Sequence, residues 1–395
     1  MNTRFHFKQR NVPVLLMLGF ALTLFLSSVT SGQGMLEYQI MPNPNPFGNT
    51  ISISDVNTNT VDFNNLGTIH IETSGELFNI DVINNEATGI INNYGTVYNI
   101  GPGGGGMISA LTFRIYGGTV NNYGDIITNN QGGVGINGNA VLNNYSNFTT
   151  QDGVIFVGVD LGVGNFDGTP GTIINYGTID NQDSGCIIGI GASGVISNKV
   201  GGFISNAGIF DKTLGTFNNE GTYQGTGTFI GTLDTGIGTV APGNSAGTMF
   251  VDGDYTLADY IDDPEYGSGT GTLEIEIGGF DAGESDFMDI TGTAFLTGGN
   301  ISFSFIDGYD IITDIPDYGD SLSWMFLEAD TGIDSFTSTV TYDFLGTPAG
   351  FMYGVYQDSN ALYFQATNVV PAPGAVVLTL LGLSSSGWLL RRKTS

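Results

Sequence analysis

Asn92-Asn93-Tyr94-Gly95-Thr96 and Asn121-Asn122-Tyr123-Gly124-Asp125 are two copies of the phrase that decides the fold of this chain. Apolar residues precede each copy, and a β-branched residue follows it. Further copies are Asn64-Asn65-Leu66-Gly67-Thr68, Asn175-Tyr176-Gly177-Thr178, Asn206-Ala207-Gly208 and Asn218-Asn219-Glu220-Gly221-Thr222, with degenerate copies at Asn84-Asn85 and Asn143-Asn144. The steps between aligned copies are 20 to 31 residues, with shorter steps of 7 to 13.

This spacing predicts an all-β fold, a parallel β-solenoid. Each long step suits one coil, and each short step suits two neighbouring strands within a coil. The β-branched runs Ile90-Ile91, Ile126-Ile127 and Ile173-Ile174 favour strands. A β-sandwich array also has short strands and Gly-rich turns, but the recurrent phrase favours the solenoid.

The phrase itself is typical of a tight corner. Asn and Gly both tolerate positive φ at low cost, as a corner requires. Stacked Asn side chains can also form a hydrogen-bonded ladder along the solenoid axis, which satisfies amides that would otherwise be buried without partners. We therefore expect each copy to mark a corner, with Asn stacked upon Asn.

The composition changes near residue 231, where the Asn pairs stop. Acidic residues number 15 before this point and 23 after it. We therefore divide the mature chain into Asn/Gly-rich solenoid repeats over 33–230 and an acidic β region over 231–368. Cys186 is alone, so no intrachain disulfide is available.

The chain is strongly acidic. Asp and Glu number 38 against nine Lys and Arg, for a formal net charge of −29. Between residues 35 and 370 the basic residues are only Arg114, Lys199 and Lys212. Such a surface repels phosphate backbones, which excludes a nucleic-acid partner. The hydrophobic share of 41% is too high for a chain that never collapses.

Residues 1–32 are typical of a Sec-type signal peptide. Arg4, Lys8 and Arg10 precede an apolar run from Val12 to Leu26, and small residues follow. The run is shorter than the about 20 residues that a membrane-spanning helix needs, which favours a cleaved signal over an anchor.

Residues 369–395 contain a break, an apolar stretch and a basic end. Pro371-Ala372-Pro373-Gly374 precedes the apolar stretch, and Arg391-Arg392-Lys393 follows it. The positive-inside rule keeps such a basic end in the cytoplasm. This order resembles the PEP-CTERM sorting tag, although Ala372 stands at the place of the name-giving Glu. The resemblance implies a transmembrane sorting helix, a transient inner-membrane anchor and processing by an exosortase-type protease.

A second resemblance covers about residues 215–340. It rests on Gly238–Thr248, on the alternating strand Leu273-Glu274-Ile275-Glu276-Ile277 and on Ser285–Ala294. This succession is similar to the C-terminal part of autotransporter-type β-helical passengers, which implies that the solenoid continues past residue 231. Because a barrel-sized run of amphipathic strands does not follow, we do not expect self-transport.

The sequence offers little catalytic machinery. Gly243-Asn244-Ser245-Ala246-Gly247 matches the G-x-S-x-G nucleophile elbow, which needs a His base after the serine. The only histidines are His6 and His70. A dinucleotide-binding G-x-G-x-x-G occurs three times, but none of the copies opens a helix that could receive a pyrophosphate. We expect no catalytic and no cofactor-binding residues.

Two other functions stay open. A β-helical polysaccharide lyase or hydrolase would use paired carboxylates as acid and base, and a lyase would also need a cation beside the uronate. A calcium-bridged surface lattice would use oxygen ligands from acidic loops, which suit weak extracellular sites. Solvated acidic loops without metal are the alternative. The candidate calcium ligands are Asp307, Asp310, Asp314, Asp317 and Asp320, and a second acidic loop holds Asp259, Asp262, Asp263 and Glu265.

These patterns together predict an exported structural or adhesive protein of the cell surface or the extracellular polysaccharide matrix. Its expected partners are an exosortase-type protease, extracellular polysaccharide or neighbouring surface proteins, and the inner membrane while it is a precursor.

The sorting tag makes a prediction about the mature protein. If residues 375–390 only hold the precursor in the membrane, mass spectrometry of the exported form should detect no peptide beyond Gly374. Recovery of an intact C-terminal peptide that includes Arg391-Arg392-Lys393 from that form would contradict the processing.

Overall fold

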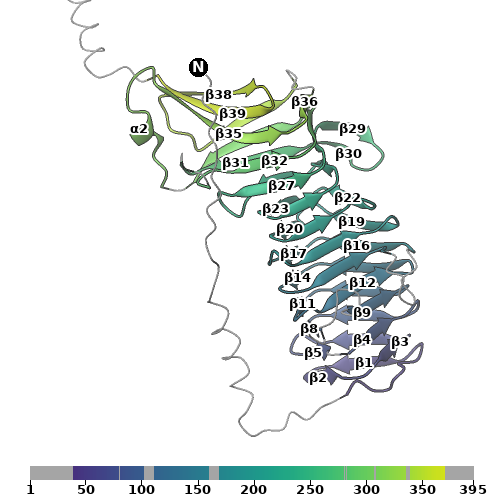
Figure 1. Cartoon of the computed structure of the whole chain (residues 1–395). Helices are drawn as coiled ribbons and strands as arrows, with labels where there is room; N and C mark the ends of the chain where they lie inside the picture. The colour runs from purple at the N-terminus through teal and green to yellow at the C-terminus, as the bar shows by residue number, and fades with distance from the viewer. Residues whose placement is uncertain are drawn as a thin grey trace, which may run out of the picture. The chain divides into compact units, whose positions relative to one another are not determined.

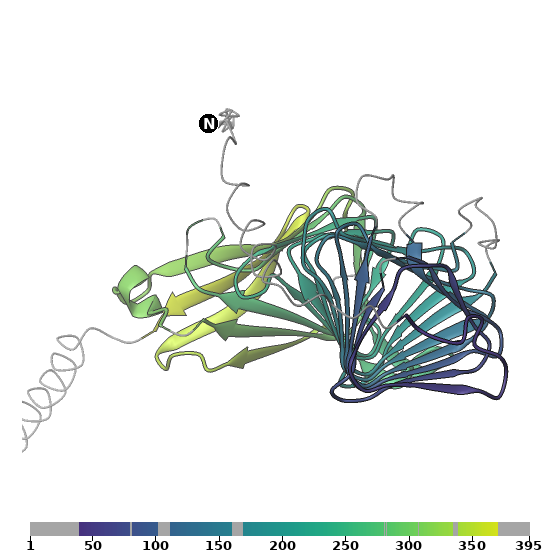
Figure 2. The same ribbon diagram turned by 90° about the horizontal axis from the view of Figure 1, so that it is seen from below.

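The computed structural model describes residues 39–79, 81–101, 111–159, 169–279, 281, 283–306, 308–334 and 339–369 (Figure 1). Consecutive strands of the repeats lie in different sheets, and every third strand pairs in parallel with the strand one coil away. The predicted parallel β-solenoid is therefore confirmed. Viewed from below, the strands of the N-terminal coils surround a three-sided interior (Figure 2).

Three long sheets form the sides of the coils. The first sheet contains β1 (Thr50–Ile53), β4 (Thr68–Ile71), β7 (Ile90–Asn93), β10 (Thr119–Asn122), β13 (Ala140–Asn144), β16 (Gly171–Asn175), β19 (Gly194–Asn198) and β22 (Thr216–Asn219). The second contains β2 (Val56–Asn59), β5 (Glu76–Asn79), β8 (Thr96–Ile100), β11 (Asp125–Asn129), β14 (Asn147–Thr150), β17 (Thr178–Asn181), β20 (Phe203–Asn206), β23 (Thr222–Gly225), β26 (Thr239–Pro242), β31 (Thr272–Ile277), β34 (Asn300–Phe305) and β37 (Thr341–Leu345). The third contains β3 (Phe63–Asn65), β6 (Ile83–Asn85), β9 (Leu111–Tyr116), β12 (Gly133–Asn137), β15 (Val154–Val157), β18 (Ile187–Ile190), β21 (Ile209–Asp211), β24 (Thr228–Ile230), β27 (Thr248–Asp252), β32 (Phe287–Ile290), β35 (Ser321–Ala329), β39 (Ala361–Asn368) and β38 (Phe351–Asp358).

The coil changes where the composition changes. The first sheet ends at β22, and a fourth sheet follows, made of β25 (Leu233–Asp234), β28 (Tyr255–Leu257), β33 (Thr293–Leu296) and β36 (Gly332–Asp334). The second and third sheets continue through both regions, and the third ends in the antiparallel strands β39 and β38. The remaining elements are a hairpin of β29 (Asp259–Asp263) and β30 (Gly267–Thr270) and the one-turn helix α2 (Ile311–Asp314).

The interior is apolar because side chains alternate between solvent and core along each strand. On the first sheet, Ile91 of β7 pairs in register with Ile69 of β4 and with Val120 of β10. All three side chains are fully buried. Burial of an aliphatic side chain of this size contributes about 1.5–3 kcal/mol, and the pattern repeats in every coil.

A ladder of buried Asn side chains runs along the corner between the first and second sheets. Each Nδ2 donates to the Oδ1 of the Asn one coil further on, at 2.7–2.9 Å. Each also donates to a backbone carbonyl of that next coil. The predicted ladder is confirmed, and its members are Asn93, Asn122, Asn144, Asn175, Asn198 and Asn219.

Shorter ladders occupy the other two corners. Asn59 donates to Asn79, which donates to Asn99, at the corner between the second and third sheets. Asn65 accepts from Asn45 and donates to Asn85 at the third corner, where the chain returns to the first sheet. The phrase copy Asn206-Ala207-Gly208 lies at the corner between the second and third sheets, where Asn206 accepts from Asn181. Copies of the phrase therefore occur at all three corners, which explains both the long and the short steps between them.

The expected reason for the corner glycines was wrong. Neither Gly95 nor Gly124 has positive φ. A Cβ atom on Gly95 would instead lie 2.1 Å from the carbonyl oxygen of Gly75, and one on Gly124 would lie 2.0 Å from that of Gly95. These corners need glycine because successive coils approach too closely for any side chain.

The predicted signal peptide (1–32) and the sorting tag (369–395) lie outside the described residues, except for Val369, which follows β39. Pro371, Ala372, Pro373, Gly374, Arg391, Arg392 and Lys393 are all outside them. Among the residues that are described, we find no helix of the length and hydropathy that a membrane crossing requires.

The ladder makes a prediction about stability. Asn144 accepts from Asn122 and donates to Asn175 and to the carbonyl of Thr178. Because Asn144→Ala leaves buried groups unpaired, it should lower the free energy of unfolding in urea by about 2–5 kcal/mol. The matched control is Asn143→Ala, one residue earlier and half-exposed, which should cost less than about 1 kcal/mol. Equal losses in the two variants would show that the buried ladder carries no special weight.

Candidate functional site

Four exposed tyrosines stack along the outside of the corner between the first and second sheets. We call Tyr94, Tyr123, Tyr145 and Tyr176 the tyrosine strip. Each follows a buried ladder Asn and therefore points outward, with 41–45% of its surface exposed. Neighbouring rings lie 4.8–5.3 Å apart and within 12° of parallel. The ring spacing follows the spacing of the coils beneath, so the strip is a regular, preformed surface.

The surroundings of the strip are also ordered. A second row of Asn side chains on the outer face of the first sheet joins Asn92, Asn121 and Asn143 through hydrogen bonds of 2.8–2.9 Å. At the same corner position in later coils, Lys199 and Glu220 form an ion pair. Partial burial, with Tyr145 and Tyr94 nearby, raises the pKa of Tyr123, so this ring stays uncharged at neutral pH.

A group of carboxylates lines a cavity of about 270 Å³ between β26 and β31. Glu274 and Glu276 lie two residues apart on the same face of β31, and both line the cavity. Asp286 also lines it, with only 1% of its surface exposed. Asp286 accepts hydrogen bonds from the backbone N–H groups of Gly247 and Glu276, at 3.0 and 2.8 Å. It therefore ties the turn before β27 to the neighbouring strand.

Asp286 is an unusual acid. Burial raises its pKa to about 8, and the nearby charges of Glu276 and Glu274 add to this, although the two N–H donors oppose it. Its oxygens are occupied and buried, so a substrate cannot reach them. We regard Asp286 as a structural clamp with a proton that titrates near neutral pH.

The G-x-S-x-G match is part of this clamp. Ser245 has φ of 107° and Gly243 has φ of 88°, in a tight turn folded around Asp286. A Cβ on Gly243 would lie 2.2 Å from the carbonyl oxygen of Ser245, which explains the glycine. His70, the histidine within the described residues, lies in β4 of an early coil, far from this turn in the stack of strands (Figure 1). The serine is without the base that a nucleophile needs.

Of the candidate calcium ligands that are described, the structure brings Asp310 and Asp314 to one cavity. Asp310 caps α2 by accepting from the N–H of Ile312, and Asp314 accepts from the hydroxyl of Tyr309. Asp317 and Asp320 lie in the exposed turn before β35, and Asp307 is outside the described residues. In the second acidic loop, Asp263 accepts from the backbone N–H groups of Glu265 and Tyr266. Over the described part of the chain, three or more potential metal ligands are nowhere close enough together to hold an ion.

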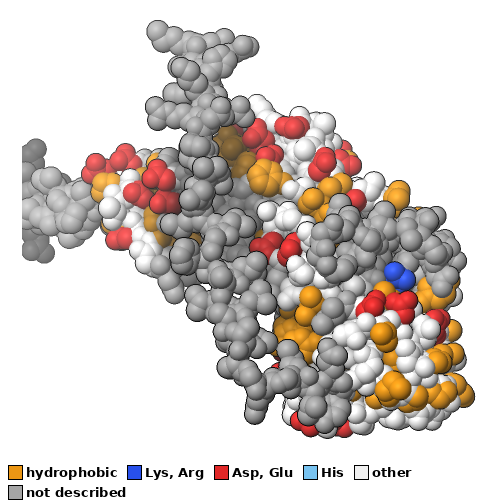
Figure 3. Space-filling model, turned by 60° about the horizontal axis from the view of Figure 1, so that its bottom comes forward, with side chains coloured by type: hydrophobic (Ala, Val, Ile, Leu, Met, Phe, Trp, Pro, Cys, Tyr) orange, Lys and Arg blue, Asp and Glu red, His pale blue; other side chains and the backbone are white. Residues whose placement is uncertain are grey.

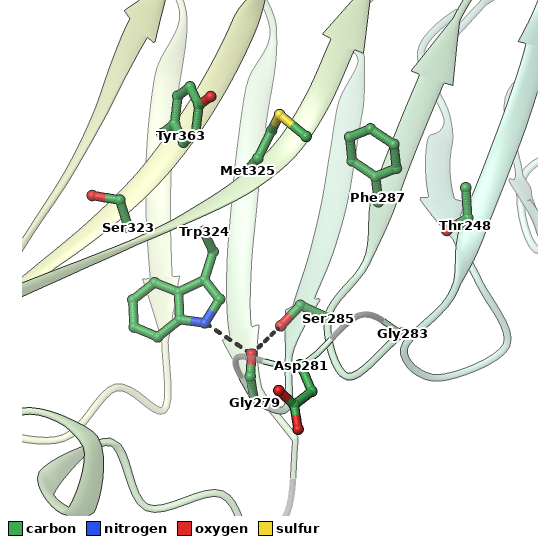
Figure 4. Close-up of a pocket in the computed structure, with 10 residues that line it drawn as sticks. All are labelled: Thr248, Gly279, Asp281, Gly283, Ser285, Phe287, Ser323, Trp324, Met325 and Tyr363. Atoms are coloured by element: carbon green, nitrogen blue, oxygen red, sulfur yellow. Dashed lines mark hydrogen bonds between the residues drawn. The ribbon is translucent and has the colours of Figure 1, made fainter. Parts of the chain in front are cut away.

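A second cavity, of about 440 Å³, opens on the outer face of the third sheet, and we call it the sheet-face pocket (Figure 4). Its floor consists of outward-facing side chains on adjacent strands. One wall is the segment that leads into β32. Within this segment, the carbonyl of Gly279 accepts from the indole N–H of Trp324 and from the hydroxyl of Ser285, at 2.8 and 2.9 Å. The described lining residues are Thr248, Gly279, Asp281, Gly283, Ser285, Phe287, Ser323, Trp324, Met325 and Tyr363.

Sequence reasoning missed the tyrosine strip and both cavities. The strip had a signal, because Tyr recurs at the variable position of the phrase in Tyr94, Tyr123, Tyr145 and Tyr176. The sheet-face pocket had none, since its residues come from four separate strands and from the segment before β32.

No family model matches the chain, and a comparison with curated proteins finds no match to it.

Asp286 makes a prediction about pH. An unfolded Asp has a pKa near about 3.9, so between about pH 4 and pH 8 the folded state holds one more proton than the unfolded state. The free energy of unfolding should therefore fall as the pH rises through this window, and this contribution should level off above it.

The test is urea unfolding at about pH 5 and pH 9 for the wild type, Asp286→Asn and Glu274→Gln. Asp286→Asn should flatten the pH dependence, whereas Glu274→Gln, at the rim of the same cavity, should largely retain it. Other acids, among them Glu276 and Asp289, also have raised pKa values, so only the difference between variants is informative. An unchanged slope in Asp286→Asn would contradict the assignment.

Proposed function

We propose that this protein is an exported, exosortase-processed structural or adhesive component of the cell surface or the extracellular polysaccharide matrix, and that it acts without catalysis. In this proposal the tyrosine strip is the contact surface, and the rigid solenoid is the scaffold that displays it. The observation that carries the proposal is the regular exposure of four stacked tyrosine rings along one edge.

A repetitive surface suits a repetitive partner. The strip offers ring edges and hydroxyl groups at intervals of 4.8–5.3 Å, because the ring faces cover one another. Stacking also fixes the side chains before binding, so little conformational entropy is lost when a polymer or a second surface protein lies along them. Tyr is favoured in such contacts because it combines a large apolar area with a polar hydroxyl.

The alternative enzyme has one site to consider, the carboxylate cavity. Glycoside hydrolysis needs two carboxyl groups that both reach the scissile bond. Glu274 and Glu276 face the cavity, but the more perturbed acid, Asp286, is buried with both oxygens engaged. The described lining also holds no cation to neutralise a uronate. These features favour a structural role for the cavity.

The test of the proposed function compares retention at the cell surface. Tyr123→Ser combined with Tyr145→Ser interrupts the strip at its centre. The control is Phe78→Ser combined with Tyr98→Ser, which removes another stacked pair, 4.7 Å apart, from the outer face of the second sheet. Both double variants should be exported normally, and only the strip variant should shift from the washed matrix into the medium.

Two outcomes would contradict the proposal. Equal retention of the strip variant and the wild type would remove the strip from the function. Release of reducing ends or unsaturated uronate from matrix polysaccharide by the purified protein, abolished by Glu276→Gln, would favour the enzyme instead.

A further inference from the structure

We propose that the sheet-face pocket binds a neutral sugar unit of a glycan. The inference deepens the proposed function, because it names a glycan as a partner, but it concerns a different surface from the tyrosine strip.

The pocket has an apolar platform. Phe287 and Met325 project outward from β32 and β35, and Tyr363 from β39, as Figure 4 shows. Tyr363 is fixed by stacking on Tyr356 of β38, with ring centroids 5.1 Å apart and planes within 9°. Phe287 of this platform is partly exposed, and its ring has no described stacking partner, unlike the rings of the tyrosine strip. The C–H face of a pyranose can therefore pack against it.

The strand that forms the middle of the platform is irregular at this point. The pairing of β35 with β39 shifts register between Met325 and Leu327, so Phe326 and Leu327 are both buried in succession while Met325 is 38% exposed. Such bulges re-aim side chains and are frequent beside binding sites. Met325 faces outward with Ser323 by the regular alternation of the strand, and the bulge directly after it buries both Phe326 and Leu327.

Polar groups lie around the platform where sugar hydroxyls would meet them. Ser323 offers a hydroxyl group that can donate or accept, and the Ser285 hydroxyl, which already donates to Gly279, can accept. Asp281 offers an exposed carboxylate, and Thr248 lies at the far end. Because Trp324 and Ser285 both donate to the carbonyl of Gly279, this wall is held in place before a ligand arrives. A mostly apolar pocket with a few fixed polar groups is typical of small-ligand sites.

Charge selects among sugars. Asp281 is the charged residue of the described lining, and the sequence contains no Lys or Arg between Lys212 and Arg391. A uronate, sulfate or phosphate would therefore meet a carboxylate without any counter-ion from this region. This favours a neutral hexose or N-acetylhexosamine unit over an anionic one.

The experiment measures binding by calorimetry with the full chain in mild detergent. The probes are cello-, malto- and chito-oligosaccharides, with oligogalacturonate as the anionic comparison. At least one neutral probe should bind, and oligogalacturonate should bind more weakly. In a Trp388→Phe background, Trp324 becomes the only tryptophan, and its emission should change on titration, which places the ligand in the pocket.

Three variants locate the site. Phe287→Ala should weaken binding by about tenfold or more, as loss of a central aromatic contact does. Thr248→Trp, which places a bulky side chain in the far end of the pocket, should do the same. The matched control is Phe250→Ala. Phe250 lies on the same face of β27 as Thr248 and is 45% exposed, but it does not line the pocket. Its loss should leave the affinity within about twofold.

Failure to bind any of the neutral probes, tighter binding of oligogalacturonate, or equal affinity in Phe287→Ala and Phe250→Ala would each overturn the inference. These outcomes are separate from those of the retention test, because Phe287→Ala leaves the tyrosine strip intact and the strip variants leave the pocket intact.

Discussion

The buried amide ladder is the interaction on which the rest of the structure depends. An Asn side chain inside a corner must find partners for two donors and an acceptor, and an identical corner one coil away supplies them in register. This requirement fixes the height and the rotation of each coil relative to the last. The ladder begins at Asn93, since Ile71 holds the same position one coil earlier, and within the described structure the Oδ1 of Asn93 has no hydrogen-bond partner.

The exposed surface follows from the same constraint. The residue after each ladder Asn turns outward at a position that repeats in every coil, so any side chain there stacks on its neighbours. Tyrosine rings form the strip, and Lys199 and Glu220 form an ion pair at the same position. The core and the contact surface are thus two consequences of one register, which explains why a phrase of five residues carries so much of the fold.

The sequence predicted the repeating coils better than the places where the chain deviates from the repeat. The β-solenoid, its corners and the Asn ladder could be predicted because they recur along the chain, and recurrence is visible in a single sequence. The reason for Gly95 was not, because the carbonyl of Gly75 lies close to it only once the coils are stacked. The role of Asp286 was hidden for the same reason, since its donors are Gly247 in the turn before β27 and Glu276 in β31. The acidic loops resemble ligand sets in sequence, and the structure adds that Asp310 and Asp263 accept hydrogen bonds from nearby backbone N–H groups.

Beyond Asn219 the amide ladder ends, and tyrosine hydroxyls take over part of its task. Tyr223 already accepts from Asn206, and Tyr255 accepts from Thr235. The strict repeat is lost in this part of the chain, which contains the fourth sheet, the hairpin and the antiparallel end. The two cavities lie in this irregular part.

The face shown in Figure 3 carries several groups of acidic side chains and few basic ones. A regular ladder can offer only a repeating edge, whereas a pocket needs strands that differ from their neighbours. In agreement with this, the described lining residues of the sheet-face pocket all lie beyond Asn219, the last member of the amide ladder.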